Sequence, residues 1–569
     1  ISRFMRYSLV IITDDLFLSL LLGNGPSGMV TSFMLAGNVP FLKAVPEDLP
    51  IDEMLRARLS NLPEGQSLYE TDLMELAEGL EGRSQNPIPL LMDNLLRPCA
   101  DVGIQADSLI EWKYDVEKQI EHIVLGRGPP GGAWHTFPAA VRTLSPGAWL
   151  CLPPHAPRGA ARLSARAVAH YCRRYVTACK LQRYFRSNVV VTSVTRAPPP
   201  DERCPSLACP LAANYCVSGY QSNGLPFRYV SRRVVAASGA ARAHTLAAHV
   251  APHALHALHA ADRALRHHCL RFPASPTPPS VLIVGSGFSA ADAVSLALRC
   301  GLHAHHLHRT PPAALAMEPY PDYCQVYKMM CDGPSGNHHN YTPYPSHVIA
   351  DVTPEPSQQY LNADDIEDYN IGLKRVKLLN IITNETTELT VNIIAVFIGS
   401  RPDLFFLQTN FTLNCINIKK DCQKCIGEKT SKMEEKGFIK NRWHYLKSIL
   451  GQSIQICKSK YLSLNEKCIC DENCDKTIPY TEKGFSCECE DENPFTYGIG
   501  FGIDADKPVD SRNPIAIDKS THEVLNAPKG MYALGPLTAD NFMRFIPGGA
   551  LALVAATLTH KHTAGRNVS

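Results

Sequence analysis

The sequence has almost no excess of one charge and no long run of apolar residues. Its 569 residues include 56 Lys and Arg against 54 Asp and Glu, which gives a net charge of +2. Such a balance does not favour nucleic acid as the main partner. Asp14 and Asp15 interrupt the apolar amino-terminal residues, which argues against a transmembrane segment of about 20 residues and against a signal peptide. We therefore expect a cytoplasmic protein whose 20 cysteines are mostly reduced.

The sequence also lacks the ligand spacing of a convincing metal site. His253, His256 and His259 recur every three residues in an Ala- and His-rich stretch, but no second element supplies matching ligands. Cys422 and Cys425 form one C-x-x-C pair, and no second pair has the same spacing. We expect no bound metal, with a cysteine zinc clip as the alternative.

Length and composition predict several domains. A chain of 569 residues is too long for one ordinary core. Residues 240–270, rich in Ala, His and Arg, predict a helix interrupted at Pro252. Residues 409–495 are rich in Lys, Glu, Asn and Cys with little apolar periodicity, which predicts a partly disordered insertion. Within it, residues 441–462 have apolar side chains at helical spacing and are a candidate surface for a regulatory protein partner.

Three glycines follow an apolar strand near the amino terminus, in the sequence LLLGNGPSGMV. In a G-x-G-x-x-G turn the first glycine permits the tight turn, the second lets backbone approach a pyrophosphate, and the third lets the helix pack on the strand. The candidate binding residues are Gly23, Gly25, Ser27 and Gly28. About 20 residues further on, where an acid would bind ribose, no carboxylate ends a clear second strand. An ordinary glycine turn stays the alternative.

A second turn of this kind lies in VLIVGSGFSAADAVSLAL, where Ala290 replaces the third glycine. The next predicted strand, HAHHLHRT, ends in His308 and Arg309. A basic residue at this strand end accommodates the 2′-phosphate of NADP, whereas an acid selects NAD. The second turn therefore predicts an NADPH site, unless Arg309 is only a solvated loop residue. The candidate residues are Gly285, Ser286, Gly287, Ser289 and Arg309.

Two dinucleotide turns in one chain are typical of flavoproteins with two dinucleotide-binding domains. The sequence therefore predicts an α/β fold in which a Rossmann-like FAD domain carries an inserted NADPH domain. The expected division is 1–240 and 391–408 and 496–569 for the FAD-binding domain, 241–390 for the NADPH-binding domain, and 409–495 for the insertion.

Several longer strings resemble the oxidative stress-induced growth inhibitor family, which is related to the flavin-containing monooxygenases. They are GNGPSG, LAEGLEGRSQNP, VLGRGPPGGAWH, YPDYCQVYKMM and YALGPLTADNFMRFIPGGAL. The resemblance implies an oxidoreductase with FAD and NADPH as cofactors and with dioxygen and an unknown small molecule as substrates. It also implies a role in growth restraint, the oxidative-stress response or cytokinesis, and it allows a location at the midbody.

The resemblance also implies further site residues. Gly132 and Trp134 match a GGxW segment that lies beside the flavin in these monooxygenases, and Asp540 matches an acid that contacts the flavin ribityl chain. Ser145 and His253 are weak catalytic candidates. His253 stands where the monooxygenases have an F-x-G-x-x-x-H fingerprint, but the Phe and Gly are absent. This departure leaves open an alternative, a non-catalytic regulatory or scaffold protein that retains the flavoprotein fold.

Overall fold

The computed structural model describes residues 11–104, 106–157, 161–196, 215–240, 242–271, 279–309, 321–355, 370–407 and 498–566. All of them belong to one compact unit, made of residues 1–412 and 495–569. The predicted insertion at 409–495, with its cysteines and its predicted helix, lies outside the described residues. Among the described helices, none is both long enough and apolar enough to cross a membrane.

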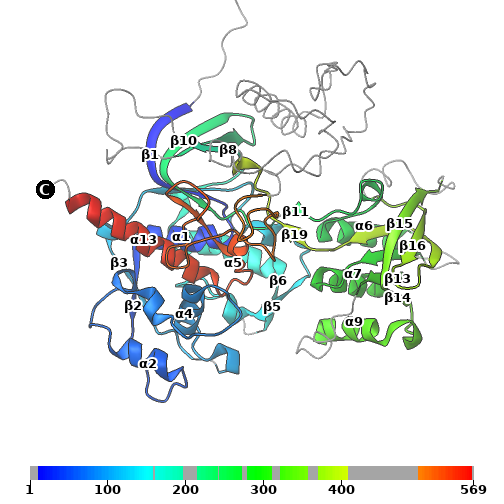
Figure 1. The fold of residues 1–569 in the computed structure, drawn as a ribbon, viewed down its shortest axis with the longest axis horizontal. Coiled ribbons are helices and arrows are strands. Elements are labelled where there is room, and N and C mark those ends of the chain that lie inside the picture. Colours follow the sequence, from blue (N-terminus) through cyan, green and yellow to red (C-terminus); the bar gives the residue numbers. More distant parts are fainter. Residues whose placement is uncertain are drawn as a thin grey trace, which may run out of the picture. The chain divides into compact units, whose positions relative to one another are not determined.

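A seven-stranded sheet forms the first part of this unit, in the order β7-β4-β1-β10-β9-β8, and β20 pairs with the last residues of β10. Figure 1 labels β1, β10 and β8 of this sheet. β1 runs parallel to β4 and β10, and β20 runs parallel to β10, whereas β9 is antiparallel to β10 and β8. Leu20, Leu21 and Val235 are fully buried because the parallel centre of the sheet is covered on both faces. The strands are β1 Ile11–Leu22, β4 His122–Leu125, β7 Phe185–Arg186, β8 Val189–Arg196, β9 Tyr215–Gln221, β10 Pro226–Ala236 and β20 Met531–Ala533.

Helices cover this sheet and contribute most of its core. Figure 1 shows α13 lying against α1 and α4, and all three supply buried side chains to one apolar cluster with α5. Their bounds are α1 Pro26–Leu35, α4 Pro87–Leu96, α5 Ala165–Ala178 and α13 Ile546–Arg566. Around them lie the helices α2 Glu53–Ser60 and α3 Leu73–Leu76 and the strand pairs β2 Asn38–Leu42 with β3 Ile110–Tyr114 and β5 Arg142–Pro146 with β6 Arg162–Ser164.

A second, four-stranded parallel sheet has the order β14-β13-β12-β18. Ala291, Val294 and Ala297 of α7 pack in the same apolar cluster as Val281 and Ile283 of β12. The elements are α6 Leu258–Arg271, β12 Ser280–Val284, α7 Phe288–Arg299, β13 His303–His308, α9 Pro321–Asp332, β14 Tyr341–Pro345 and β18 Ile393–Val396. An antiparallel sheet follows, made of β15 His347–Pro354, β16 Lys374–Asn380 and β17 Thr386–Val391.

The chain passes from the first sheet to the second and back along one short ribbon. β11 Arg242–Ala243 follows the last long strand of the first sheet, β10. It pairs antiparallel with β19 Ser400–Arg401, which follows the second domain. Both crossings therefore lie side by side, as expected for an inserted domain. The predicted fold class is confirmed: an α/β chain with two Rossmann-like units, the second inserted into the first.

Two local expectations need correction. Residues 391–408 were expected to return to the first domain, but β18 pairs with β12 in the second sheet, so the second domain continues through Val396. The helix expected over 240–270 begins only at Leu258. Its earlier part is extended chain and a short 3-10 turn at Ala251–His253, where Pro252 lacks the amide hydrogen that a longer helix needs.

Candidate dinucleotide-binding sites

The first glycine turn has the backbone geometry that the sequence predicted. Gly23 has φ of +131°, and a Cβ there would lie 2.2 Å from the carbonyl oxygen of Ala237. A Cβ on Gly28 would lie 2.0 Å from the carbonyl oxygen of Gly23, so α1 packs directly on the turn. A Cβ on Gly25, in contrast, would meet no atom within 4 Å. The first and third glycines are thus required by the fold itself, and the second faces open space.

The amino terminus of α1 is built to receive an anion. Gly25 is its N-cap without a side-chain cap, and Pro26 occupies the first turn, where its missing amide hydrogen costs nothing. The amides of the first turn precede the first intrahelical bond, from Met29 N to Gly25 O at 3.0 Å. Unpaired amides and the positive end of the helix dipole both favour a phosphate at this point. Ser27 is buried in the same turn.

A second loop is fastened over this turn. Asn24 Nδ2 donates to the carbonyl of Gly128 at 2.6 Å, and the amide of Gly131 donates to the carbonyl of Asn24 at 2.9 Å. A Cβ on Gly132 would lie 3.1 Å from the Cα of Gly25. Trp134 follows in the same loop, half-buried and edge-on to Phe137 with ring centroids 5.5 Å apart. The predicted GGxW segment therefore lies against the first turn, as a shared ligand site requires.

The carboxy-terminal segment reaches the same place, but Asp540 does not face open space. A Cβ on Gly535 would lie 2.5 Å from Ser27 Oγ. The Asp540 carboxylate accepts hydrogen bonds from Ser84 Oγ at 2.5 Å and from Asn86 Nδ2 at 3.0 Å. Burial raises the pKa of Asp540 to about 6 against the lowering effect of these donors. In this structure Asp540 joins two loops, and its contact with a flavin stays a prediction.

The second turn repeats the geometry of the first. Gly285 has φ of +129°, and a Cβ there would lie 2.2 Å from the carbonyl oxygen of Phe397. Gly287 is the N-cap of α7 and has open space at its Cβ position. Ala290 is buried and takes the place of the third glycine, with its Cβ 3.6 Å from the position of a Cβ on Gly285. Ser286 is half-buried and Ser289 is exposed.

Arg309 directly follows β13, the parallel neighbour of β12, and it is exposed. This is the strand end at which a basic residue would meet the 2′-phosphate of NADP. A residue on the same strand, which no sequence pattern indicated, supports the turn. The neutral ring of His306 donates from Nε2 to the carbonyl of Gly285 at 2.7 Å and accepts at Nδ1 from the Tyr341 hydroxyl at 3.0 Å. Burial lowers the pKa of His306 to about 4, so the ring stays uncharged.

The two weak catalytic candidates gain no support from their surroundings. The carbonyl of Ser145 accepts from Thr143 Oγ1 at 2.7 Å within β5. His253 ends a 3-10 turn ahead of α6, and of the three spaced histidines only His259 lies in that helix. Within the ranges that the structure describes, no group of three or more His, Cys, Asp or Glu is placed to hold a metal ion.

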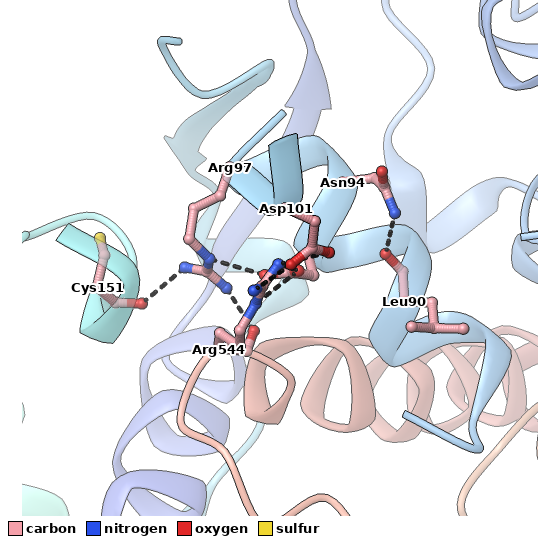
Figure 2. Close-up of polar contacts among 7 residues, drawn as sticks. Leu90, Asn94, Arg97, Asp101, Cys151 and Arg544 are labelled. Carbon is pink, nitrogen blue, oxygen red and sulfur yellow. Dashed lines mark hydrogen bonds and ion pairs between the residues drawn. The ribbon is translucent and has the colours of Figure 1, made fainter. Parts of the chain in front are cut away.

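The sequence also did not reveal a charge network in which the side chains of Asp93, Arg97 and Arg544 are buried. Asp93 Oδ1 accepts from Arg97 Nε at 2.8 Å, and Asp93 Oδ2 accepts from Arg544 Nε at 2.8 Å. Figure 2 shows Arg544 lying between Arg97 and Asp101, and its Nη1 donates to Asp101 at 2.8 Å. Arg97 also donates to the carbonyls of Cys151 and Arg544. α4, the segment before α13 and the Cys151 loop are thereby tied together. The one sign of this network in the sequence is the i,i+4 spacing of Asp93 and Arg97, which places an acid and a base on one face of a helix.

Both turns therefore fit a dinucleotide: each pairs a strand end with a helix amino terminus, and each has an open position at its second glycine. The pyrophosphates of FAD and NADPH bind to the same kind of glycine turn and helix amino terminus. The turns alone therefore do not show which cofactor binds at which site.

Comparison with known proteins places the chain among named relatives. No family model matches it. Two solved structures align with most of it: a bacillithiol disulfide reductase of Bacillus cereus (9% identity, 96% of this chain, 100% of that chain, TM-score 0.48) and a flavin-containing monooxygenase of Stenotrophomonas maltophilia (12% identity, 96% and 99%, TM-score 0.44). At these scores neither alignment carries weight for function, and the fold rests on the strands and turns described above.

The curated relatives are closer. Oxidative stress-induced growth inhibitor 1 of mouse is 31% identical over 95% of both chains. The human protein of the same name is 30% identical over 96% of this chain and 95% of its own. Human oxidative stress-induced growth inhibitor 2 is 28% identical over 95% of this chain and 93% of its own. The chain belongs to the oxidative stress-induced growth inhibitor family.

Proposed function

We propose that this protein is an FAD- and NADPH-dependent oxidoreductase of the monooxygenase type. The observation that carries the proposal is the pair of glycine turns, each with its first glycine left-handed and its second open. One chain with two dinucleotide sites can bring an electron donor and an electron acceptor into one molecule. When bound, the two cofactors supply hydride transfer and activation of dioxygen, which explains why the sequence needs no nucleophile or acid–base pair.

We assign FAD to the first turn and NADPH to the second. At the first turn, the amides of α1 would hold the pyrophosphate, beside the loop that carries Gly132 and Trp134. At the second turn, α7 does the same, His306 holds the carbonyl of Gly285, and Arg309 binds the 2′-phosphate. The protein would thus bind and orient the reacting groups and shield them from water. The organic substrate is an unknown small molecule.

We extend the proposal to a cellular role on the strength of the relatives' names, which describe growth inhibitors induced by oxidative stress. The activity would link redox state to growth restraint or to cytokinesis, in the cytoplasm or at the midbody. Residues 409–495 would offer the surface for a regulatory protein partner.

The competing function is a scaffold that keeps the fold without turnover. It is favoured by Asp540, whose carboxylate oxygens are already engaged by Ser84 and Asn86, and by the incomplete fingerprint around His253. Absorbance spectroscopy of the purified protein separates the two. A yellow protein with a band near that of free flavin, bleached by NADPH under nitrogen and restored by air, supports the enzyme. A colourless protein that takes up neither FAD nor NADPH refutes it.

A further inference from the structure

The adenosine end of the first site has no acid in the usual place. In Rossmann units a carboxylate at the end of the strand beside β1 binds the ribose hydroxyls. β1 has two parallel neighbours, β10 and β4, and β4 is the one followed by the loop that is fastened over the first turn. Leu22 of β1 pairs with Leu125 of β4, so the two strands end at the same edge. The residues after β4 are Gly126 and Arg127.

The structure shows why the first of these positions cannot carry an acid. A Cβ on Gly126 would lie 2.1 Å from the amide carbon of Asn24, the residue that fastens the loop over the first turn. Backbone bonds hold Gly126 there: its amide donates to Arg186 O at 3.0 Å, and its carbonyl accepts from Val189 N at 3.0 Å. Any side chain at residue 126 would displace Asn24, so a carboxylate that binds the ribose would have to come from another residue.

One carboxylate is brought to this place by the returning chain. Arg127 Nη2 lies 3.8 Å from Asp403 Oδ2, and the Arg127 guanidinium lies 5.9 Å from the ring centroid of Phe405. The short helix Phe405–Leu407 contacts β8. Arg127 and Asp403 thus meet beside the end of β4. Asp403 is 26% exposed and Arg127 is 59% exposed, so the carboxylate remains accessible to a ligand.

We propose that Asp403 binds the adenosine ribose hydroxyls of the dinucleotide at the first site, and that Arg127 positions its carboxylate. This inference rests on the proposed function, because it takes the first turn as the FAD site. It goes further because it names the acid that would determine specificity for the ribose. This acid comes from a segment that follows the second domain in sequence.

The test measures FAD binding to Asp403→Asn by fluorescence titration of protein stripped of flavin. We expect a dissociation constant raised by about tenfold to a hundredfold, the usual loss for a hydrogen bond to a charged group. Glu355→Gln is the matched control, since Glu355 is also 26% exposed and pairs with an arginine, Arg375, at 2.8 Å in the second domain. Arg127→Ala should weaken binding less than Asp403→Asn.

Competition by ADP and 2′-deoxy-ADP for the FAD site tests the atom concerned. Wild-type protein should prefer ADP, and Asp403→Asn should bind both nucleotides alike. If wild-type protein binds FAD and Asp403→Asn binds it equally well, the inference is overturned and the proposed function stands. If wild-type protein binds no FAD, both fall. A variant that unfolds is recognised by its thermal melting curve, and Asp403→Glu, which keeps the charge, then decides by the same competition.

Discussion

Substitution of Gly25 separates ligand binding from folding, because its Cβ position is open in the protein. A side chain there meets no protein atom within 4 Å, and Gly25→Val costs the helix about 1 kcal/mol at most through the weaker N-cap. It would, however, occupy the space in which the pyrophosphate must lie. Losing two amide–phosphate hydrogen bonds of about 1.5–3 kcal/mol each removes about 3–6 kcal/mol of binding, at least a hundredfold in affinity.

The assay is the flavin-to-protein ratio after purification, followed by titration with FAD. Gly287→Val is the matched control, since Gly287 is the N-cap of α7 in the second turn and a Cβ there also meets no atom within 4 Å, so FAD binding at the first turn should not change. Gly28→Ala serves as a control for a folding defect. Its Cβ would lie 2.0 Å from Gly23 O, so this variant should lower the stability of the folded protein. Full flavin occupancy in folded Gly25→Val would refute the assignment of the first turn.

Three further outcomes are expected. Arg309→Ala should raise the KM for NADPH far more than that for NADH, whereas Arg299→Ala, an exposed arginine in the last turn of α7, should alter neither; steady-state kinetics or titration with each nucleotide checks this. Asp93→Ala removes the carboxylate that contacts both buried arginines, Arg97 and Arg544. Arg544 keeps its pairing with Asp101, but Arg97 loses this carboxylate, and the free energy of unfolding in urea should fall by about 3–5 kcal/mol. The pKa of His306 falls from 6.5 to about 4 on burial, so the folded state binds fewer protons than the unfolded one, and stability should fall as pH drops from 6.5 towards 4. His306→Gln should make that fall shallower in denaturation curves at stepped pH, and an unchanged slope would contradict the buried neutral ring.

Local sequence patterns predicted the turns well because their geometry is local. Gly23 and Gly285 each directly follow a strand and adopt positive φ, and a Cβ on Gly28 would lie 2.0 Å from the carbonyl oxygen of Gly23, only five residues earlier. The spacing of three small residues carries that requirement directly. Helix α7 and its two neighbouring strands were recognisable for the same reason: all lie within a short stretch of chain.

Long-range partners were not predictable in this way. Ser84 and Asn86 bond to Asp540 across more than 450 residues of sequence, so a pattern near Asp540 could not show that its carboxylate is engaged. β18 looked like the start of the return to the first domain, but its fully buried residues add a strand to the second sheet. The apolar sequence of a strand predicts that the strand is buried, but it does not predict which sheet the strand joins.

Both turns were predicted, but a candidate residue for recognising the adenosine ribose was named only at the second turn. The difference lies in how far along the chain the neighbouring strand is. At the second turn the neighbouring strand β13 follows α7 directly, and Arg309 stands at its end. At the first turn the neighbouring strand is β4, which follows α1 only after residues 36–121, so a search about 20 residues downstream examines the wrong segment. Even at the true strand end, Gly126 has no space for a side chain. If that end of the site is to recognise a ribose, the acid has to come from a distant segment, and sequence spacing cannot reveal it.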